Sequence, residues 1–233
     1  MERSKPIIVT SDASGAQQAA RQGFLVMIVD VIDMSTTLES ALEAGAAAVL
    51  GASPDETRAP VKVDPERMGR YAAQIARSHQ TDIILISEPR VGSDQERRQR
   101  CQKVIKGIEA EGGILAAVLP NLGAETPRML DMQGKVVVAV TDTGGVAYDA
   151  AFQESPRVIT GTVARTYRHR GLEPALRAVA RARQEWGDCN GLAVVAASRN
   201  SMEDVLAAQF IANLMLKQDD RGISNETDYG NRP

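Results

Sequence analysis

The feature that most constrains the fold is the regular alternation of short apolar runs with segments of helical periodicity. The apolar runs have the length of β-strands and lie at residues 7–10, 24–31, 47–50, 83–87, 114–119, 135–140, 157–159 and 192–196. The helical segments lie at residues 16–22, 37–44, 66–77, 94–111, 147–154, 172–186 and 201–216. Strands that are apolar along their length and alternate with helices are typical of a parallel sheet covered on both faces. The sequence therefore predicts an α/β fold with three layers and a largely parallel or mixed sheet.

Chain length and composition agree with one globular unit. The chain has 233 residues, of which 43% are apolar, and this is enough for a substantial core. We expect a single α/β domain over residues 1–217, within which two subdomains could meet near 120–140. Residues 218–233 are mostly polar and have little to bury, so we expect them to form a loose C-terminal tail.

Composition also excludes several classes of function. Aromatic residues make up only 3% of the chain and the net charge is −3, which argues against a nucleic-acid partner. No apolar run reaches the ~18 residues that a membrane span needs, and the N-terminus lacks the apolar core of a signal peptide. Cys101 and Cys189 show no metal-binding spacing and are typical of reduced thiols. We therefore expect a cytoplasmic protein without a membrane partner.

Polar side chains gather in the segments that follow several apolar runs. These residues are Asp30, Asp33, Thr36 and Thr37, then Glu88 and Arg90, then Asp142, Thr143 and Gly144, and finally Glu203 and Asp204. The carboxyl ends of parallel strands meet at one edge of a sheet, so these groups are expected to converge. Carboxylates with hydroxyls suit Mg²⁺, and paired carboxylates can position a water molecule. Glycines followed by a helix N-terminus let the backbone approach an anion.

A purely structural interpretation of the same residues is also open. Asp30 and Asp33 can simply end a strand, with Ser35 capping the next helix. The segment from Thr141 to Gly145 can be only a turn. Likewise, Ser201 followed by two acidic residues is the usual composition of a helix start.

Segments in a fixed order along the chain resemble one known family. Residues 28–38, IVDVIDMSTTL, followed by ALEAGA, resemble the pattern I-D-V-L-R-A-T-T-T followed by A-L-x-x-G-A. Residues 123–129 are similar to its G-N-S-P segment, and residues 134–147 to G-K-x-V-x-x-x-T-T-N-G-T-R-A. Residues 194–197 and 202–208 resemble its alanine-rich strand and L-E-D helix. Over residues 25–215 the chain thus resembles the 2-phosphosulfolactate phosphatase (ComB) family.

This resemblance implies a Mg²⁺-dependent phosphatase that hydrolyses 2-phospho-3-sulfolactate to 3-sulfolactate and phosphate, as in coenzyme M biosynthesis. The residues expected to carry catalysis are Asp30, Asp33, Glu88 and Asp142. Those expected to bind the small anionic phosphorylated substrate are Thr36, Thr37, Arg90, Thr143 and Gly144. The residues expected to bind Mg²⁺ are Asp30, Asp142, Glu203 and Asp204. A homo-oligomer is compatible with the sequence.

The chain departs from the family pattern at two arginines. Asp33 and Val146 stand where the pattern has arginine. Each arginine-to-anion pair contributes about 1.5–3 kcal/mol, so their replacement weakens recognition of a trianionic substrate. The alternatives are therefore a phosphatase for a related phosphomonoester, an inactive paralogue that binds a small anion or a protein partner, or a domain whose loops are structural and whose likeness reflects fold alone.

Overall fold

Two parallel four-stranded sheets form the centre of the molecule. In the computed structural model, which describes residues 5–224 and the side chains as far as residue 217, the first sheet has the order β1-β8-β2-β7. Its strands are β1 (Ile7–Ser11), β2 (Leu25–Val29), β7 (Val158–Gly161) and β8 (Leu192–Ala196). The second sheet has the order β3-β6-β4-β5, with β3 (Ala48–Ala52), β4 (Ile83–Ser87), β5 (Leu115–Pro120) and β6 (Val136–Val140). Every strand pair in both sheets is parallel.

The two sheets differ in how the chain passes through them. The strands of the second sheet follow one another along the chain, and we call this sheet with its helices the continuous half. The strands of the first sheet form two pairs separated by the whole second sheet, and we call this part the interrupted half. The first sheet begins with β1 and β2, and the chain then passes through α2 into the second sheet. All strands of the second sheet follow one another from β3 to β6, after which the chain returns through α6 to β7 and β8. Two subdomains were expected to meet near residues 120–140, but this stretch lies inside the second sheet, where residues 121–135 connect β5 to β6.

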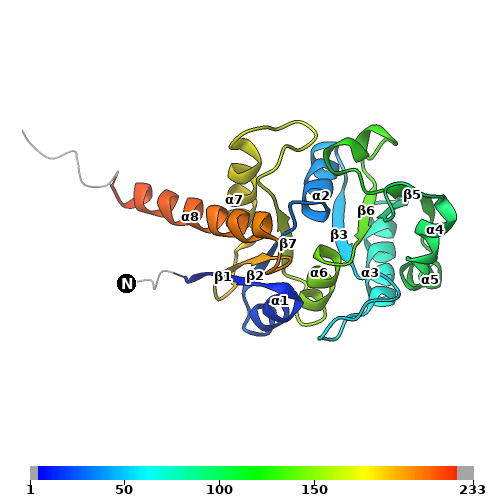
Figure 1. Cartoon of the computed structure of the whole chain (residues 1–233), viewed down its shortest axis with the longest axis horizontal. Helices are drawn as coiled ribbons and strands as arrows, with labels where there is room; N and C mark the ends of the chain where they lie inside the picture. Colours follow the sequence, from blue (N-terminus) through cyan, green and yellow to red (C-terminus); the bar gives the residue numbers. More distant parts are fainter. Residues whose placement is uncertain (1–4, 225–233) are drawn as a thin grey trace, which may run out of the picture.

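Helices cover the sheets and complete three layers (Figure 1). Helices α7 (Glu173–Glu185) and α8 (Met202–Ser224) pack on one face of the first sheet, and α1 (Asp12–Arg21) packs on the other beside α6 (Gly144–Phe152). In the second sheet, α3 (Pro65–Ser78) lies against the strands and against α5 (Gln102–Ala110). The short α4 (Asp94–Gln99) contacts β5, whereas α2 (Met34–Glu43) packs on β3, β6 and the 3-10 helix η1 (Gly123–Arg128).

Aliphatic side chains from both faces of the central strands build the core. All residues of β2, β4, β6 and β8 are buried, as expected for parallel strands with helices on both sides. Within β2, Val26 and Ile28 face one core cluster, while Leu25, Met27 and Val29 face the other. The alternating direction of side chains along a strand explains this division.

Two glycines allow α3 and α5 to pack at backbone contact. A Cβ atom at Gly69 would overlap the carbonyl oxygen of Val104, and one at Gly107 would overlap that of Glu66. Each helix therefore presents a glycine to the backbone of the other, which sets their close separation.

The structure confirms the α/β class, the parallel strands and the helices on both faces. The helical segment expected at residues 94–111 is divided into α4 and α5 by a break at Arg100 and Cys101. Helix α8 continues to Ser224, so residues 218–224 of the expected tail are helical, and residues 225–233 lie outside the described part. None of the helices in the described part has the length and apolar character needed to span a bilayer.

Candidate functional site

The carboxyl ends of strands from both sheets meet in one region. Three contacts join the two sheets there: Asp30 with Gly144, Asp33 with Arg90 and Thr37 with Asn121. A fourth, Thr36 with Thr162, joins two segments of the first sheet. The first member of every pair follows β2, whereas Gly144, Arg90, Asn121 and Thr162 follow β6, β4, β5 and β7. The region is thus built where the segments after parallel strands converge, as ligand sites in α/β proteins commonly are.

Asp30 occupies the centre of this region and is almost fully buried, with 2% of its surface exposed. Its Oδ2 atom accepts hydrogen bonds from the backbone N–H of Gly144 at 2.9 Å and from the Thr143 hydroxyl at 3.2 Å. Gly144 is the first residue of α6, so the carboxylate lies at a helix N-terminus, where N–H groups and the helix dipole favour negative charge.

Burial nevertheless dominates the ionisation of Asp30. Removal from water, with a smaller contribution from the nearby negative charge of Asp204, raises the pKa of its carboxyl to about 7. The hydrogen bonds from Thr143 and Gly144 oppose this change only in part. Near neutral pH the side chain therefore exists in both its acid and its base form, which is the property of a general acid or base.

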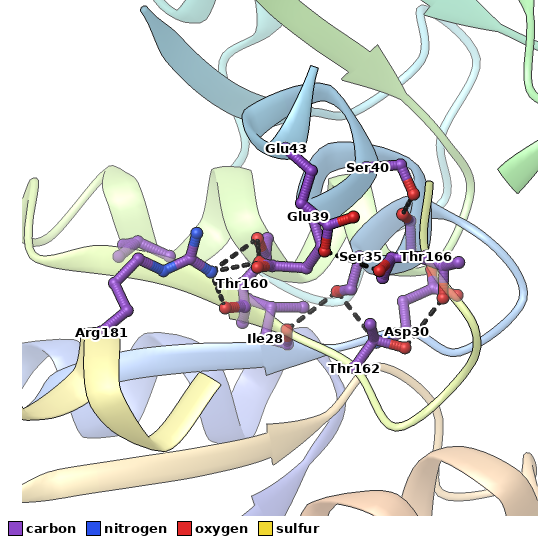
Figure 2. A network of polar contacts seen from close by, with 12 residues as sticks. Ile28, Asp30, Ser35, Glu39, Ser40, Glu43, Thr160, Thr162, Thr166 and Arg181 are labelled. Atoms are coloured by element: carbon purple, nitrogen blue, oxygen red, sulfur yellow. Dashed lines mark hydrogen bonds and ion pairs between the residues drawn. The ribbon is translucent and has the colours of Figure 1, made fainter. Parts of the chain in front are cut away.

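Polar contacts fix the helix that follows Asp30 (Figure 2). The Ser35 hydroxyl donates to the Ile28 carbonyl at 2.8 Å and accepts the backbone N–H of Asp30 at 3.0 Å. One turn further along α2, Glu39 accepts a hydrogen bond from the Thr160 hydroxyl at 2.6 Å and pairs with Arg181 of α7. Helix α2 is thus fastened to β2, β7 and α7, and this holds Asp30 in place.

The hydroxyls of Thr36 and Thr37, which were expected to hold phosphate, are used within the fold. Thr36 donates to the Val31 carbonyl at 2.8 Å and lies 2.8 Å from the Thr162 hydroxyl. Thr37 donates to the Asn121 side chain at 2.5 Å. Both threonines are buried, and the structure assigns them to the junction of α2 with β7 and β5.

Asp33 and Arg90 form an ion pair with each other. Burial raises the pKa of Asp33, and the Arg90 guanidinium opposes that change. Arg90 was expected to stabilise charge on a phosphate, but in the structure its positive charge faces the carboxylate of Asp33. The side chain remains about half exposed, at 49%.

Glu88 and Asp142 lie close enough to interact electrostatically. Burial raises the pKa of Glu88, and the Asp142 carboxylate adds to this, whereas Arg100 and Arg90 lower it. Asp142 itself pairs with Arg100 at 2.5 Å. The two carboxylates therefore share a neighbourhood that contains two guanidinium groups.

Two pockets open on either side of Asp142. One, of about 300 Å³, is lined by Thr143, Val146 and Ser198 and by the loop at Glu56–Pro60. The other, of about 310 Å³, is lined by Pro89, Glu96 and Arg100. Glu56 and Asp142 border both pockets. Thr143 lines the first pocket and also donates to Asp30, so it lies between this pocket and the buried carboxylate.

The four residues expected to bind Mg²⁺ do not gather around one point. Asp204 accepts the backbone N–H of Val31 at 2.8 Å, Asp142 pairs with Arg100, and Glu203 is exposed at the start of α8. In the described part of the chain, no group of three or more acidic, histidine or cysteine side chains has the geometry of a metal site. This ligand set therefore does not fit a resident Mg²⁺ ion.

Sequence reasoning missed two residues that shape the region. Arg100 lies in the segment 94–111, which was expected only to be helical, yet it pairs with Asp142 and lines a pocket. Asp149 is fully buried and accepts hydrogen bonds from Ser53, Asp64 and Gln153, which anchors both ends of the loop between β3 and α3. Its only sequence signal was a carboxylate inside the otherwise apolar helix GGVAYDAAF.

Comparison with protein families, curated proteins and solved structures gives no match. The resemblance to the phosphatase family therefore rests on the sequence motifs.

The contact between α6 and Asp30 predicts that Gly144→Ala is destabilising. A Cβ atom there would overlap Asp30 Oδ2 and lie 2.9 Å from Asp30 Cγ. We expect a loss of about 1–3 kcal/mol in the free energy of unfolding, although alanine is otherwise the better helix former. Urea denaturation measures it. In an Asp30→Ala background the carboxylate is gone, so the same change should cost less; equal costs in both backgrounds would refute the contact.

Proposed function

We propose that the protein is a hydrolase of small anionic phosphomonoesters, of which 2-phospho-3-sulfolactate is the first candidate. The observation that carries the proposal is the arrangement of Thr143 and Asp30. Thr143 lines a pocket of about 300 Å³, and its hydroxyl donates at 3.2 Å to a buried carboxylate at a helix N-terminus. Hydrolysis can use such an arrangement, in which the pocket binds the substrate, the hydroxyl relays a proton and the carboxylate accepts it as a base.

In this proposal the phosphate group lies in the pocket beside Thr143. A water molecule attacks phosphorus and the bond to the ester oxygen breaks. The water proton passes to the Thr143 oxygen, whose own proton passes to Asp30 Oδ2. Burial raises the pKa of Asp30 to about 7, so near neutral pH the carboxylate can accept this proton and return it through Thr143 to the departing ester oxygen, which leaves as the alcohol. Arg58, which lines the same pocket, supplies positive charge to the phosphate.

No step of this mechanism uses the expected Mg²⁺ ion, because its expected ligands do not converge. Glu203 and Asp142 point to other partners or to solvent, as described above. The resemblance still predicts dependence on Mg²⁺, so activity is to be compared in Mg²⁺ and in EDTA.

A second function, binding of a small anion or a protein partner without catalysis, is favoured by the two replaced arginines. Asp33 neutralises Arg90, and Val146 packs with Ala13 and Ala150 in a small apolar cluster. The site then has fewer free cations than a trianionic substrate needs. Binding of phosphate or sulfonate compounds in calorimetry, without turnover, would select this function.

The proposal predicts release of inorganic phosphate from 2-phospho-3-sulfolactate or from related phosphomonoesters. The Asp30→Ala variant should lose at least about 100-fold in kcat because its general base is gone. The matched control is Asp188→Asn, an exposed carboxylate that pairs with Arg157 at 3.0 Å away from the pocket. We expect the control to keep wild-type activity. Absence of release from every ester, or equal rates for Asp30→Ala and wild type, would exclude phosphatase activity at this site.

A further inference from the structure

Helix α8 has apolar side chains on two faces, but the protein covers only one of them. The covered face packs on the first sheet through Ala207, Ala208, Ile211, Ala212 and Met215. The other face carries Met202, Leu206 and Phe210, which are 72%, 61% and 44% exposed. Large apolar side chains that follow one another along an exposed helix face mark an interaction surface. We call these three residues the outer face of α8.

The outer face also carries one charge of each sign at equal distances from its centre. Glu203 lies seven residues before Phe210, and Lys217 lies seven residues after it. Both side chains are exposed. Residues spaced by sevens stay on one side of a helix, so Glu203, Phe210 and Lys217 line one stripe with Leu206 beside them. A two-fold rotation about an axis at Phe210 therefore exchanges the positions of Glu203 and Lys217.

From this symmetry we infer that the outer face of α8 is a dimer interface, in which it pairs antiparallel with α8 of a second copy of the chain. In this arrangement Phe210 lies next to Phe210 of the second copy at the two-fold axis. Glu203 lies opposite Lys217 of the second copy, and the two-fold axis forms this pair twice. A surface that is complementary to itself is what an isologous two-fold interface requires. A different partner protein would have no need of charges related by this reversal.

The surroundings of α8 leave room for a second copy. The helix projects beyond the body of the molecule (Figure 1). It also contacts β1, which is an edge strand of the first sheet and exposes 39% of Val9. Between Met202 and Lys217 the helix is about 24 Å long, which is long enough for the centre of an interface of ordinary size, about 800 Å² per partner.

Sedimentation equilibrium of the full chain over a range of concentrations tests the inference. We expect the wild type to reach twice the mass of one chain. Leu206→Asp should raise the dimer dissociation constant at least tenfold, with unchanged circular dichroism because the side chain is exposed in the monomer. The control is Ile114→Asp, which changes an apolar residue of similar exposure, 65%, on the other sheet and should leave the dimer intact. A wild type that stays monomeric, or a dimer that Leu206→Asp does not weaken, overturns the inference.

A charge exchange tests the antiparallel orientation. Glu203→Lys and Lys217→Glu each place like charges opposite one another at both ends, so each single variant should dissociate more readily than the wild type. The double variant restores opposite charges and should recover the wild-type dissociation constant. Equal self-association of the single and double variants would contradict the antiparallel arrangement. These measurements do not depend on whether the protein hydrolyses phosphomonoesters.

Discussion

Asp30→Asn is expected to make the protein more stable than the wild type at pH 8, by up to about 4 kcal/mol. Burial raises the pKa of Asp30 to about 7, roughly three units above its ordinary value, and each unit corresponds to about 1.4 kcal/mol. The folded protein binds this proton more tightly than the unfolded chain does. The contribution of Asp30 to stability is therefore complete below pH ~4 and is lost as the pH rises to about 7.

Urea denaturation of both proteins at several pH values measures this effect. Asparagine resembles the protonated carboxyl and can still accept from Thr143 and Gly144, so its contribution is independent of pH. The difference between variant and wild type should grow from pH 4 to pH 7 and remain constant above. Asp188→Asn, at an exposed site, should show no such growth. A variant that is less stable than wild type at pH 8 would show that the ionised carboxylate stabilises the fold.

The second large effect is expected for Asp149→Ala, which should lower the free energy of unfolding by about 3 kcal/mol or more. The carboxylate accepts from the Ser53 hydroxyl at 2.6 Å, the backbone N–H of Asp64 at 2.9 Å and the Gln153 amide at 2.7 Å. Alanine leaves these donors without an acceptor, and each buried donor without a partner costs about 1–3 kcal/mol. The loop that walls both pockets also loses its attachment to α6.

Denaturant unfolding and limited proteolysis check this prediction together. Asp149→Ala should be cut faster between Ser53 and Asp64 than the wild type. Asp149→Asn keeps one acceptor oxygen and should lie between the two in stability. If Asp149→Ala unfolds at the same urea concentration as wild type, the hydrogen bonds of Asp149 do not hold the loop.

The strands and helices could be predicted because their signals are local. Apolar runs such as residues 83–87 and 192–196 match β4 and β8 closely, since a buried parallel strand is apolar on both faces. The break between α4 and α5 was missed because the basic run around Arg100 keeps a helical pattern. The division of the strands into two sheets could not be predicted either, because it depends on which distant strands pair.

The sequence predicted where the candidate site lies, at the ends of the strands, but not which side chains contact one another there. Placing Asp30 and Thr143 at strand ends correctly indicated that they would converge. The partners of Arg90 and Thr37 could not be found, because they lie on segments distant in sequence, brought close by the packing of the two sheets. Asp142 was expected to face Asp30, but Arg100 draws its carboxylate away.

The chain path through the two sheets gives Asp30 a further meaning. Asp30 belongs to the interrupted half of the molecule, whereas Thr143 and Gly144, its hydrogen-bond donors, belong to the continuous half. The pKa of Asp30 therefore depends on the contact between the two halves of the molecule and changes when that contact opens. A nuclear magnetic resonance titration of Asp30 can thus follow their separation during unfolding, or under a bound ligand, without any probe attached to the protein.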